Sequence, residues 1–191
     1  HQDGSGYGIF AQRYDADGNT LGGEFQVNTT VSDNQLLSTV AMDAAGNFVV
    51  TWSSINQDGS GYGIYGQRFD ADGNTVGYEF QVNTETFGNQ IHSSVAMDTA
   101  GNFVITWSSV LQDGSGYGVY GQWFDAGGNT IGGEFQVNTT TTDSQHFSSV
   151  AISAAGHFAV VWSSYGQDGS GYGVYGQLFA GNSAPTIDDA S

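Results

Sequence analysis

The sequence of 191 residues contains no cysteine, so it can form no disulfide and offers no thiol for catalysis or metal binding. It also contains no lysine, and Arg13 and Arg68 are its only arginines. With 19 acidic residues, the chain has a formal net charge of −17. Nucleic acids and anionic membrane surfaces are bound by basic surfaces, so this charge argues against both as partners.

Long apolar runs are missing as well. The longest are short, such as residues 158–162, and we therefore expect no membrane insertion. Proline occurs once, at Pro185, whereas glycine occurs 30 times. Abundant glycine with almost no proline, at fixed places in a repeat, is typical of tight turns between strands rather than of disorder.

The most prominent feature that is present is the heptapeptide Gln-Asp-Gly-Ser-Gly-Tyr-Gly. It starts without change at Gln2, Gln57, Gln112 and Gln167, so each copy lies 55 residues after the previous one. The similarity continues through most of each period. Self-similarity at a fixed spacing of this size indicates a repeat architecture.

One full unit predicts four antiparallel strands. Residues 38–43 and 47–53 form a hairpin with Gly46 in its turn, and the second of these strands is apolar on both faces. Residues 62–70 form the third strand, in which Gly66 indicates the close approach of another backbone. Residues 79–83 alternate as a half-polar outer strand. The fold class is therefore all-β, with β-propeller-like blades of four strands and about 3.5 units per chain.

The units divide the chain into a repeat array at 1–181 and a linker towards a following domain at 182–191. The array contains a half unit (1–37), two units (38–92 and 93–147) and a partial unit (148–181). Because the sequence starts inside a repeat, we interpret it as a piece of something longer. A ring would then be closed by a second chain or by missing repeats, and an open filament is the alternative, so self-association as a dimer or filament is expected.

Two acidic motifs are candidate calcium sites, because calcium prefers several oxygen ligands at close spacing. The first is the turn with Asp15 and Asp17, repeated with Asp70 and Asp72. The second is the glycine-rich heptapeptide, whose aspartates are Asp3, Asp58, Asp113 and Asp168. The alternative for both motifs is a turn in which Asp caps the backbone. The third copy of the first motif has lost one carboxylate, which favours that alternative.

Aromatic residues are candidates for contacting a ligand. Four tyrosines lie beside the glycine-rich heptapeptide, namely Tyr7, Tyr62, Tyr117 and Tyr172, and either carbohydrate contact or anchoring of the loop explains them. Trp123 occupies a position that varies among the units, which indicates an exposed aromatic. The tryptophans at 52, 107 and 162 end an apolar strand and are expected in the core.

No catalytic centre is predicted. The four histidines fall at non-equivalent places in the unit, which disfavours a repeated metal site. Paired carboxylates are the groups needed for glycoside hydrolysis. Here they lie on near-identical turns, which do not offer the different environments that an acid and a base need. The sequence is therefore interpreted as that of a protein that is not an enzyme.

The string from Gln57 to Asp70, with residues 77–84 and 103–107, resembles a repeat of very large secreted bacterial proteins. These are adhesin-like or RTX-type calcium-associated proteins of marine bacteria and cyanobacteria. Residues 182–186 resemble the lead-in to a cadherin-like sandwich domain. The resemblance covers residues 2 to about 180 and implies an extracellular or cell-surface location, with no catalytic residue carried over.

Two functional hypotheses follow. The first is a non-catalytic extracellular module for adhesion, matrix or filament assembly, stabilised by calcium. The second is a lectin-like propeller that binds carbohydrate at repeated shallow sites and acts by avidity.

Overall fold

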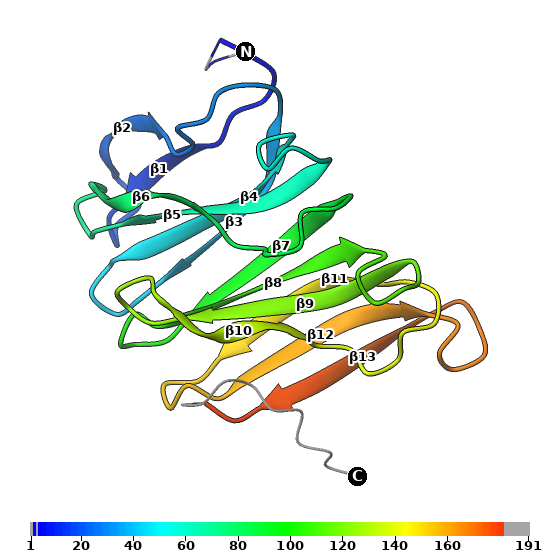
Figure 1. The fold of residues 1–191 in the computed structure, drawn as a ribbon. Helices are drawn as coiled ribbons and strands as arrows, with labels where there is room; N and C mark the ends of the chain where they lie inside the picture. Colours follow the sequence, from blue (N-terminus) through cyan, green and yellow to red (C-terminus); the bar gives the residue numbers. More distant parts are fainter. Residues whose placement is uncertain (1, 3, 182–191) are drawn as a thin grey trace.

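The computed structural model describes residue 2 and residues 4–181. This part of the chain consists of strands and loops, and it contains no helix that could cross a membrane. The strands are β1 (Phe10–Tyr14), β2 (Thr20–Gln26), β3 (Gln35–Met42), β4 (Phe48–Ile55), β5 (Tyr62–Phe69), β6 (Thr75–Gln81), β7 (Gln90–Met97), β8 (Phe103–Val110), β9 (Tyr117–Phe124), β10 (Thr130–Gln136), β11 (Gln145–Ile152), β12 (Phe158–Tyr165) and β13 (Tyr172–Phe179) (Figure 1).

These strands form four antiparallel sheets that follow one another along the chain. The first sheet is the pair β1–β2, the second is β3-β4-β5-β6, the third is β7-β8-β9-β10 and the fourth is β11-β12-β13. Every pairing joins strands that are neighbours in sequence, as in a propeller blade. The predicted all-β fold of four-stranded antiparallel repeats is confirmed.

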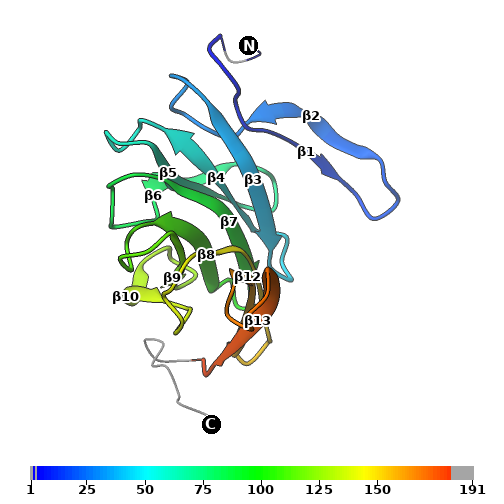
Figure 2. The ribbon, with the colours of Figure 1, turned by 90° about the vertical axis from the view of Figure 1, so that its right-hand side faces the viewer.

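The sheets stand side by side, with their first strands in contact. Strand β7 contacts β3 on one side and β11 on the other, and these three strands form the inner rim of the array. The hairpin β1–β2 and strand β13 lie at opposite ends of it in both views (Figures 1 and 2). The described residues therefore form an open arc of sheets.

The core lies between the sheets. The middle strands β4, β5, β8 and β9 are buried on both faces, which agrees with the apolar pattern of the second strand in each unit. Paired phenylalanines stack between β4 and β5, between β8 and β9 and between β12 and β13, for example Phe103 and Phe124 with ring centroids 4.8 Å apart. Trp52, Trp107 and Trp162 are buried, as predicted.

Two predicted strand boundaries are wrong. The inner strand of the second sheet begins at Gln35 rather than at residue 38, because the Gln35 side chain is buried and donates to the carbonyl of Ser32. The outer strand spans Thr75–Gln81 rather than 79–83, since Thr75 already pairs with Phe69 directly after the turn. Asn83 lies beyond the end of this strand, and its side chain accepts a hydrogen bond from the Ile64 amide.

Gly66 has a different role from the one predicted. The three atoms that lie closest to a Cβ built at this position all belong to one side chain. A Cβ atom at Gly66 would lie 2.8 Å from Cζ of Phe80, whose ring crosses the strand at this point. Gly121 and Phe135 repeat the arrangement in the third sheet. The glycine therefore makes room for an aromatic ring that fastens the outer strand to the third one.

Candidate functional site

The clearest candidate site is a hollow between the third and fourth sheets, which we call the aromatic pocket. Its volume is about 300 Å³. Strands β7 and β11 supply two residues each, β9 and β13 supply their first residues, and the loop before β11 supplies a serine. The lining residues are Ile91, His92, Tyr117, Ser144, His146, Phe147 and Tyr172.

A β-bulge sets the direction of the side chains on each inner strand. Strands β3, β7 and β11 each pair with the strand that follows them in the chain. In each pair the register shifts around the third residue of the inner strand. Leu37, His92 and Phe147 stand at this position with φ of 58°, 56° and 57°. Left-handed backbone costs a non-glycine residue roughly 1–2 kcal/mol. Bulges and such strained residues occur often at functional sites, where they redirect side chains.

The rings of the pocket contact one another in a chain. The Phe147 centroid lies 4.5 Å from that of His92 and 4.0 Å from that of His146. The His146 ring lies 5.3 Å from Tyr172 and 6.4 Å from Tyr117. Side chains from two sheets thus form one aromatic surface, and more than half of the Phe147 side chain remains exposed on it (53 %).

The two histidines of the pocket are neutral bases at pH 7. Burial lowers the pKa of His92, and the nearby His146 lowers it further. Burial also lowers the pKa of His146. Within the described residues Nδ1 of His92 is buried without a hydrogen-bond partner. The pocket therefore combines aromatic faces with two imidazole rings, and one of these rings has a buried nitrogen without a hydrogen-bond partner in the described residues.

A second hollow of about 290 Å³ adjoins the aromatic pocket through two shared residues, His92 and Phe147. Its other lining residues come from all three inner strands and are Leu37, Ser38, Thr39, Ser93 and Ser148. The three bulge residues therefore face a common region at the inner rim, and serine and threonine side chains line it beside them.

The predicted ligand-binding tyrosines separate into two groups. Tyr117 and Tyr172 line the aromatic pocket. Tyr7 and Tyr62 occupy equivalent positions in their units, but the neighbouring inner strands carry other residues there. The place of His146 is taken by Leu36 and Ile91 in the earlier units. Tyr7 is exposed beside Asn34, and Tyr62 pairs with Ile55.

The prediction that Trp123 is an exposed aromatic is wrong. Its side chain is only 2 % exposed and meets Phe158 edge to face, with centroids 5.4 Å apart. The position varies because it faces the next sheet. At the same place Arg68 reaches forward and donates to the carbonyl of Ala126. In the fourth sheet the matching turn is lost at Ala180, and Trp123 fills the contact with an apolar ring.

The glycine-rich heptapeptide acts as a structural clamp. Gln57 Nε2 donates to Glu79 Oε1 (2.5 Å), while Oε2 of Glu79 accepts from the backbone and hydroxyl of Thr29 on the preceding sheet. Asp58 Oδ1 accepts from the Ser60 amide. Asp113 and Asp168 repeat this bond with Ser115 and Ser170, whereas Asp3 lies outside the described residues.

The other acidic motif is used inside its own turn. Oδ1 of Asp15 accepts from the amides of Asp17 and Asn19, and Oδ2 accepts from the Asn19 side chain. Asp70 makes the same three bonds, with Asp72 and Asn74 as donors. These bonds lower the pKa of Asp15 and Asp70, the Asn side chain first. Among the described residues, no three acidic or histidine side chains form a group that could hold a metal ion.

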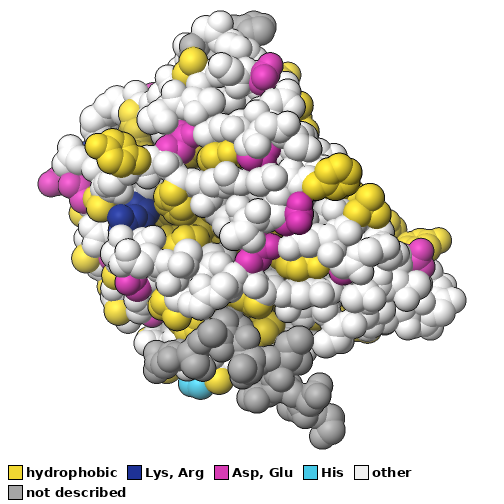
Figure 3. Space-filling model, in the orientation of Figure 1, with side chains coloured by type: hydrophobic (Ala, Val, Ile, Leu, Met, Phe, Trp, Pro, Cys, Tyr) yellow, Lys and Arg dark blue, Asp and Glu magenta, His cyan; other side chains and the backbone are white. Residues whose placement is uncertain are grey.

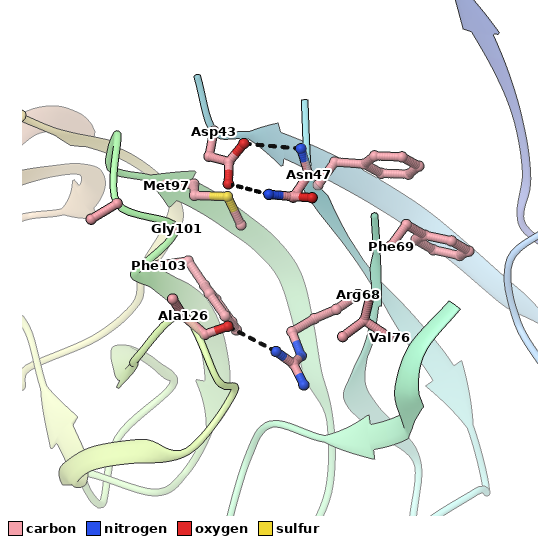
Figure 4. Close-up of a pocket in the computed structure, with 11 residues that line it drawn as sticks. Asp43, Asn47, Arg68, Phe69, Val76, Met97, Gly101, Phe103 and Ala126 are labelled. Atoms are coloured by element: carbon pink, nitrogen blue, oxygen red, sulfur yellow. Dashed lines mark hydrogen bonds between the residues drawn. The ribbon is translucent and has the colours of Figure 1, made fainter. Parts of the chain in front are cut away.

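A further hollow of about 260 Å³ lies between the second and third sheets (Figure 4). At its edge Asn47 donates a hydrogen bond to the Asp43 carboxylate (2.8 Å), and Arg68 extends to the carbonyl of Ala126. The polar groups here are already bonded within the chain. The Arg68 contact recurs as Arg13 with Ala71, so we assign this hollow to the joint between sheets.

Sequence reasoning missed the three central residues of the aromatic pocket, His92, His146 and Phe147. The histidines seemed unrelated because they are not 55 residues apart. They nevertheless occupy adjacent positions of the unit, since His146 is equivalent to Ile91 and Phe147 to His92. These positions fall in the stretch where the copies differ most, and that variability was the available signal.

No family model and no curated protein matches the chain. Solved structures do. An endo-arabinase from Bacteroides thetaiotaomicron VPI-5482 matches with a TM-score of 0.54 and 13 % identity, over 84 % of this chain and 63 % of that one. An alpha-L-arabinofuranosidase from Lactobacillus brevis matches with 0.52 and 16 %, over 93 % and 61 %.

A fucose lectin from Kordia zhangzhouensis, solved with methyl-fucoside, has 12 % identity over 72 % of this chain and 97 % of its own, but its TM-score of 0.39 is too low to establish a shared fold. The chain spans 63 % and 61 % of the length of the first two structures. At such identities the likeness is one of fold.

The comparison corrects one prediction. The repeat architecture was interpreted as that of a protein that is not an enzyme. That interpretation is wrong, because two solved structures that resemble this fold with TM-scores above 0.5 are by name enzymes, an endo-arabinase and an alpha-L-arabinofuranosidase. A propeller-like array of near-identical sheets is thus compatible with enzymes. What the chain shares with them is the all-β arrangement of antiparallel sheets.

Proposed function

We propose that this chain binds carbohydrate in the aromatic pocket. The observation that carries the proposal is the convergence of rings from two sheets, with His92 and Phe147 held in left-handed conformations at the inner rim. An isolated strained residue has many explanations. Three at equivalent bulges, each facing the same region, support a site for which the fold accepts a cost in stability.

The chemistry of the pocket suits a sugar ring. A pyranose or furanose presents an apolar face of C–H groups and an edge of hydroxyls. The exposed face of Phe147 and the ring of Tyr172 can cover the apolar face, while the Ser144 hydroxyl and the His146 imidazole, which line the pocket, can bind hydroxyls. Small-ligand sites typically combine such an apolar lining with few polar groups.

Charge favours an uncharged sugar. The chain has a net charge of −17, and acidic side chains are spread over the face shown in Figure 3. An anionic polysaccharide would be repelled by this field. The two similar enzymes are by name an endo-arabinase and an alpha-L-arabinofuranosidase, and arabinose itself is an uncharged sugar. We therefore place neutral pentoses and hexoses first, as the end of a chain or as short oligosaccharides.

The setting of the site is proposed from the sequence. The resemblance to repeats of secreted bacterial adhesin-like proteins, together with the absence of cysteine and the acidic surface, supports an extracellular or cell-surface location. There, a sugar pocket would serve attachment to a matrix or to another cell. Several such chains on one surface would add avidity to weak single sites.

The test is binding of a neutral glycan panel, followed by calorimetry on each hit. We expect binding that Phe147→Ala and His146→Ala each weaken at least about tenfold, since they remove ring contact at the centre of the pocket. Phe87→Ala is the matched control, because Phe87 is an exposed loop phenylalanine outside the pocket.

Melting temperatures of all three variants should stay close to that of the parent chain. A panel without hits would refute the proposal, and so would a hit that survives both pocket substitutions.

A further inference from the structure

The outward face of the fourth sheet is a second candidate for function. We call it the terminal face and define it by Ala159, Val161, Val174 and Leu178, which point away from the third sheet. Phe158, Val160 and Trp162 alternate with them and are buried against the third sheet.

The terminal face is unusually exposed for residues of this type. Val174 is 78 % exposed, whereas the equivalent Val119 and Ile64 are fully buried against the next sheet. Leu178 is 75 % exposed. Beside these side chains lies a hollow that also includes Ala151 and Gly176. Exposed apolar surface of this kind on a sheet marks a contact surface.

Its residues also depart from the pattern that joins one sheet to the next. Thr106 Oγ1 lies 3.0 Å from Ser148 Oγ on the following sheet, and Thr51 makes the same bond to Ser93. The terminal face has Val161 at this position. It likewise has Leu178 where Arg68 binds the carbonyl of the following sheet. Both polar links are thus replaced by apolar side chains.

This replacement bears on the kind of partner. A further repeat would bring a serine equivalent to Ser38 and a turn carbonyl, and Val161 and Leu178 could bind neither. A terminal repeat that faces water usually carries a polar outer face. The terminal face has changed in the opposite direction, which favours an apolar contact that differs from the joint between sheets.

Charge indicates which partner. The positions of Asp43 and Asp98 are taken by Ser153, and those of Asp70 and Asp125 by Ala180. The residues that line the hollow on this face include no acidic side chain. In a chain of net charge −17 an uncharged face is where a second, equally charged copy can approach without strong repulsion.

We propose that the terminal face binds the same face of a second copy, which gives a two-fold symmetric dimer. An isologous contact needs only one self-complementary surface, and an uncharged apolar face provides it. A head-to-tail contact is disfavoured, since the matching surface on the second sheet is partly covered by β1–β2 through Ile9 and Phe25. The dimer would place two aromatic pockets on one particle, but it does not depend on what those pockets bind.

Light scattering tests the proposal with the whole 191-residue chain. We expect a mass twice the chain mass of 20.1 kDa at micromolar concentrations. Val174→Asp and Leu178→Arg should each raise the dissociation constant at least roughly tenfold, because each would bury a charge at the contact. Val40→Asp is the matched control, since Val40 is an exposed valine at the opposite open end of the array.

Cross-linking tests the symmetry. The chain has no cysteine, so Val174→Cys supplies a single thiol. In a two-fold contact both thiols lie in the same interface, so a flexible bis-maleimide cross-linker should give a covalent dimer that Val40→Cys does not give. Circular dichroism would check that each variant is folded.

A monomer at all concentrations, a mass that grows without limit, or a dimer that only Val40→Asp disrupts would each overturn the proposal.

Discussion

Two parts of the repeat behave in opposite ways. The heptapeptide at residues 57–63 is unchanged in all four copies, whereas the second and third residues of the inner strands β3, β7 and β11 form a different pair in each copy. The unchanged part is engaged in the clamp around Glu79. The changing part, with Leu37, His92 and Phe147, faces the inner rim. Within this repeat, identity therefore accompanies structural roles, and the candidate site lies where the copies diverge.

The largest effect is expected inside the unchanged loop. Gly61 has φ of 60°, and a Cβ atom there would overlap the carbonyl oxygen of Gly88. Gly61→Ala should lower the free energy of unfolding by roughly 2–4 kcal/mol, through strain and overlap together. Gly23→Ala is the control, since Gly23 has open space around its Cα. Denaturant titration of both variants measures the difference, and equal stabilities would contradict this assignment of the loop.

The clamp itself should contribute less than the loop backbone. Glu79→Ala removes one bond to Gln57 and two to Thr29, at a cost of roughly 1–2 kcal/mol for a partly exposed, charged acceptor. Tyr78→Ala next to it should be nearly neutral, because Tyr78 is 93 % exposed. Glycan binding should be unchanged in both variants. If Glu79→Ala abolished glycan binding without changing stability, the binding site would lie at the unchanged loop rather than at the variable inner strands.

At the inner rim, a substitution that relieves backbone strain should raise the stability of the protein rather than lower it. Leu37→Gly removes the cost of left-handed backbone at an exposed side chain, although glycine also gains freedom in the unfolded chain. The net expectation is a stabilisation of up to about 1 kcal/mol. Thermal unfolding checks it, with Leu36→Gly as the control at a residue without positive φ. Destabilisation by Leu37→Gly would show that contacts of the leucine side chain and the greater freedom of glycine in the unfolded chain outweigh the backbone strain.

Acid should weaken the aromatic pocket before it affects the turns. The pKa values of His92 and His146 lie below the ordinary 6.5, so both rings are neutral above that pH. As pH falls through the lowered values, the unfolded chain binds protons more readily, so stability and glycan binding should decline together. Asp15 and Asp70, with pKa values below 3.8, should be affected only at lower pH.

Calorimetry across pH 5–8 measures this decline, and His146→Gln should reduce it. A flat profile in the parent chain would contradict a role for the imidazoles.

The smallest effect is expected from calcium. Calcium binding stays a prediction from the acidic motifs. The carboxylate of Asp70 already accepts three hydrogen bonds within its turn, so any rise in melting temperature in millimolar calcium over chelator should be slight. Asp70→Asn and Asp58→Asn would identify which motif is responsible. A large rise would show that the unchanged loops have a binding role after all.

Much of the fold could be predicted from the sequence because a period of 55 residues repeats each signal. The apolar strand 47–53, the glycine turns and the buried tryptophans were all found in this way. The role of Gly66 was missed, because a missing Cβ does not tell whether a ring or a backbone approaches. Trp123 was missed because its partner, Phe158, belongs to another unit.

The aromatic pocket could be predicted only in part. Tyr117 and Tyr172 were found because they recur beside a conspicuous loop. His146 and Phe147 were not found, because neither residue recurs at the equivalent position of the other units, and recurrence was the signal used to choose candidates. The bulge that redirects them leaves no mark in sequence, as leucine, histidine and phenylalanine all occupy it.

The clamp around Glu79 has a consequence for how such a chain changes length over generations. One of its contacts spans 22 residues, from Gln57 to Glu79, and the others span 50, from Thr29 to Glu79. Both distances are shorter than the 55-residue period. Duplication or deletion of one whole period by unequal recombination therefore copies or removes a complete clamp, because the residues on either side of the junction keep equivalent partners. The array could therefore become longer or shorter during evolution without new substitutions at the contacts between its sheets.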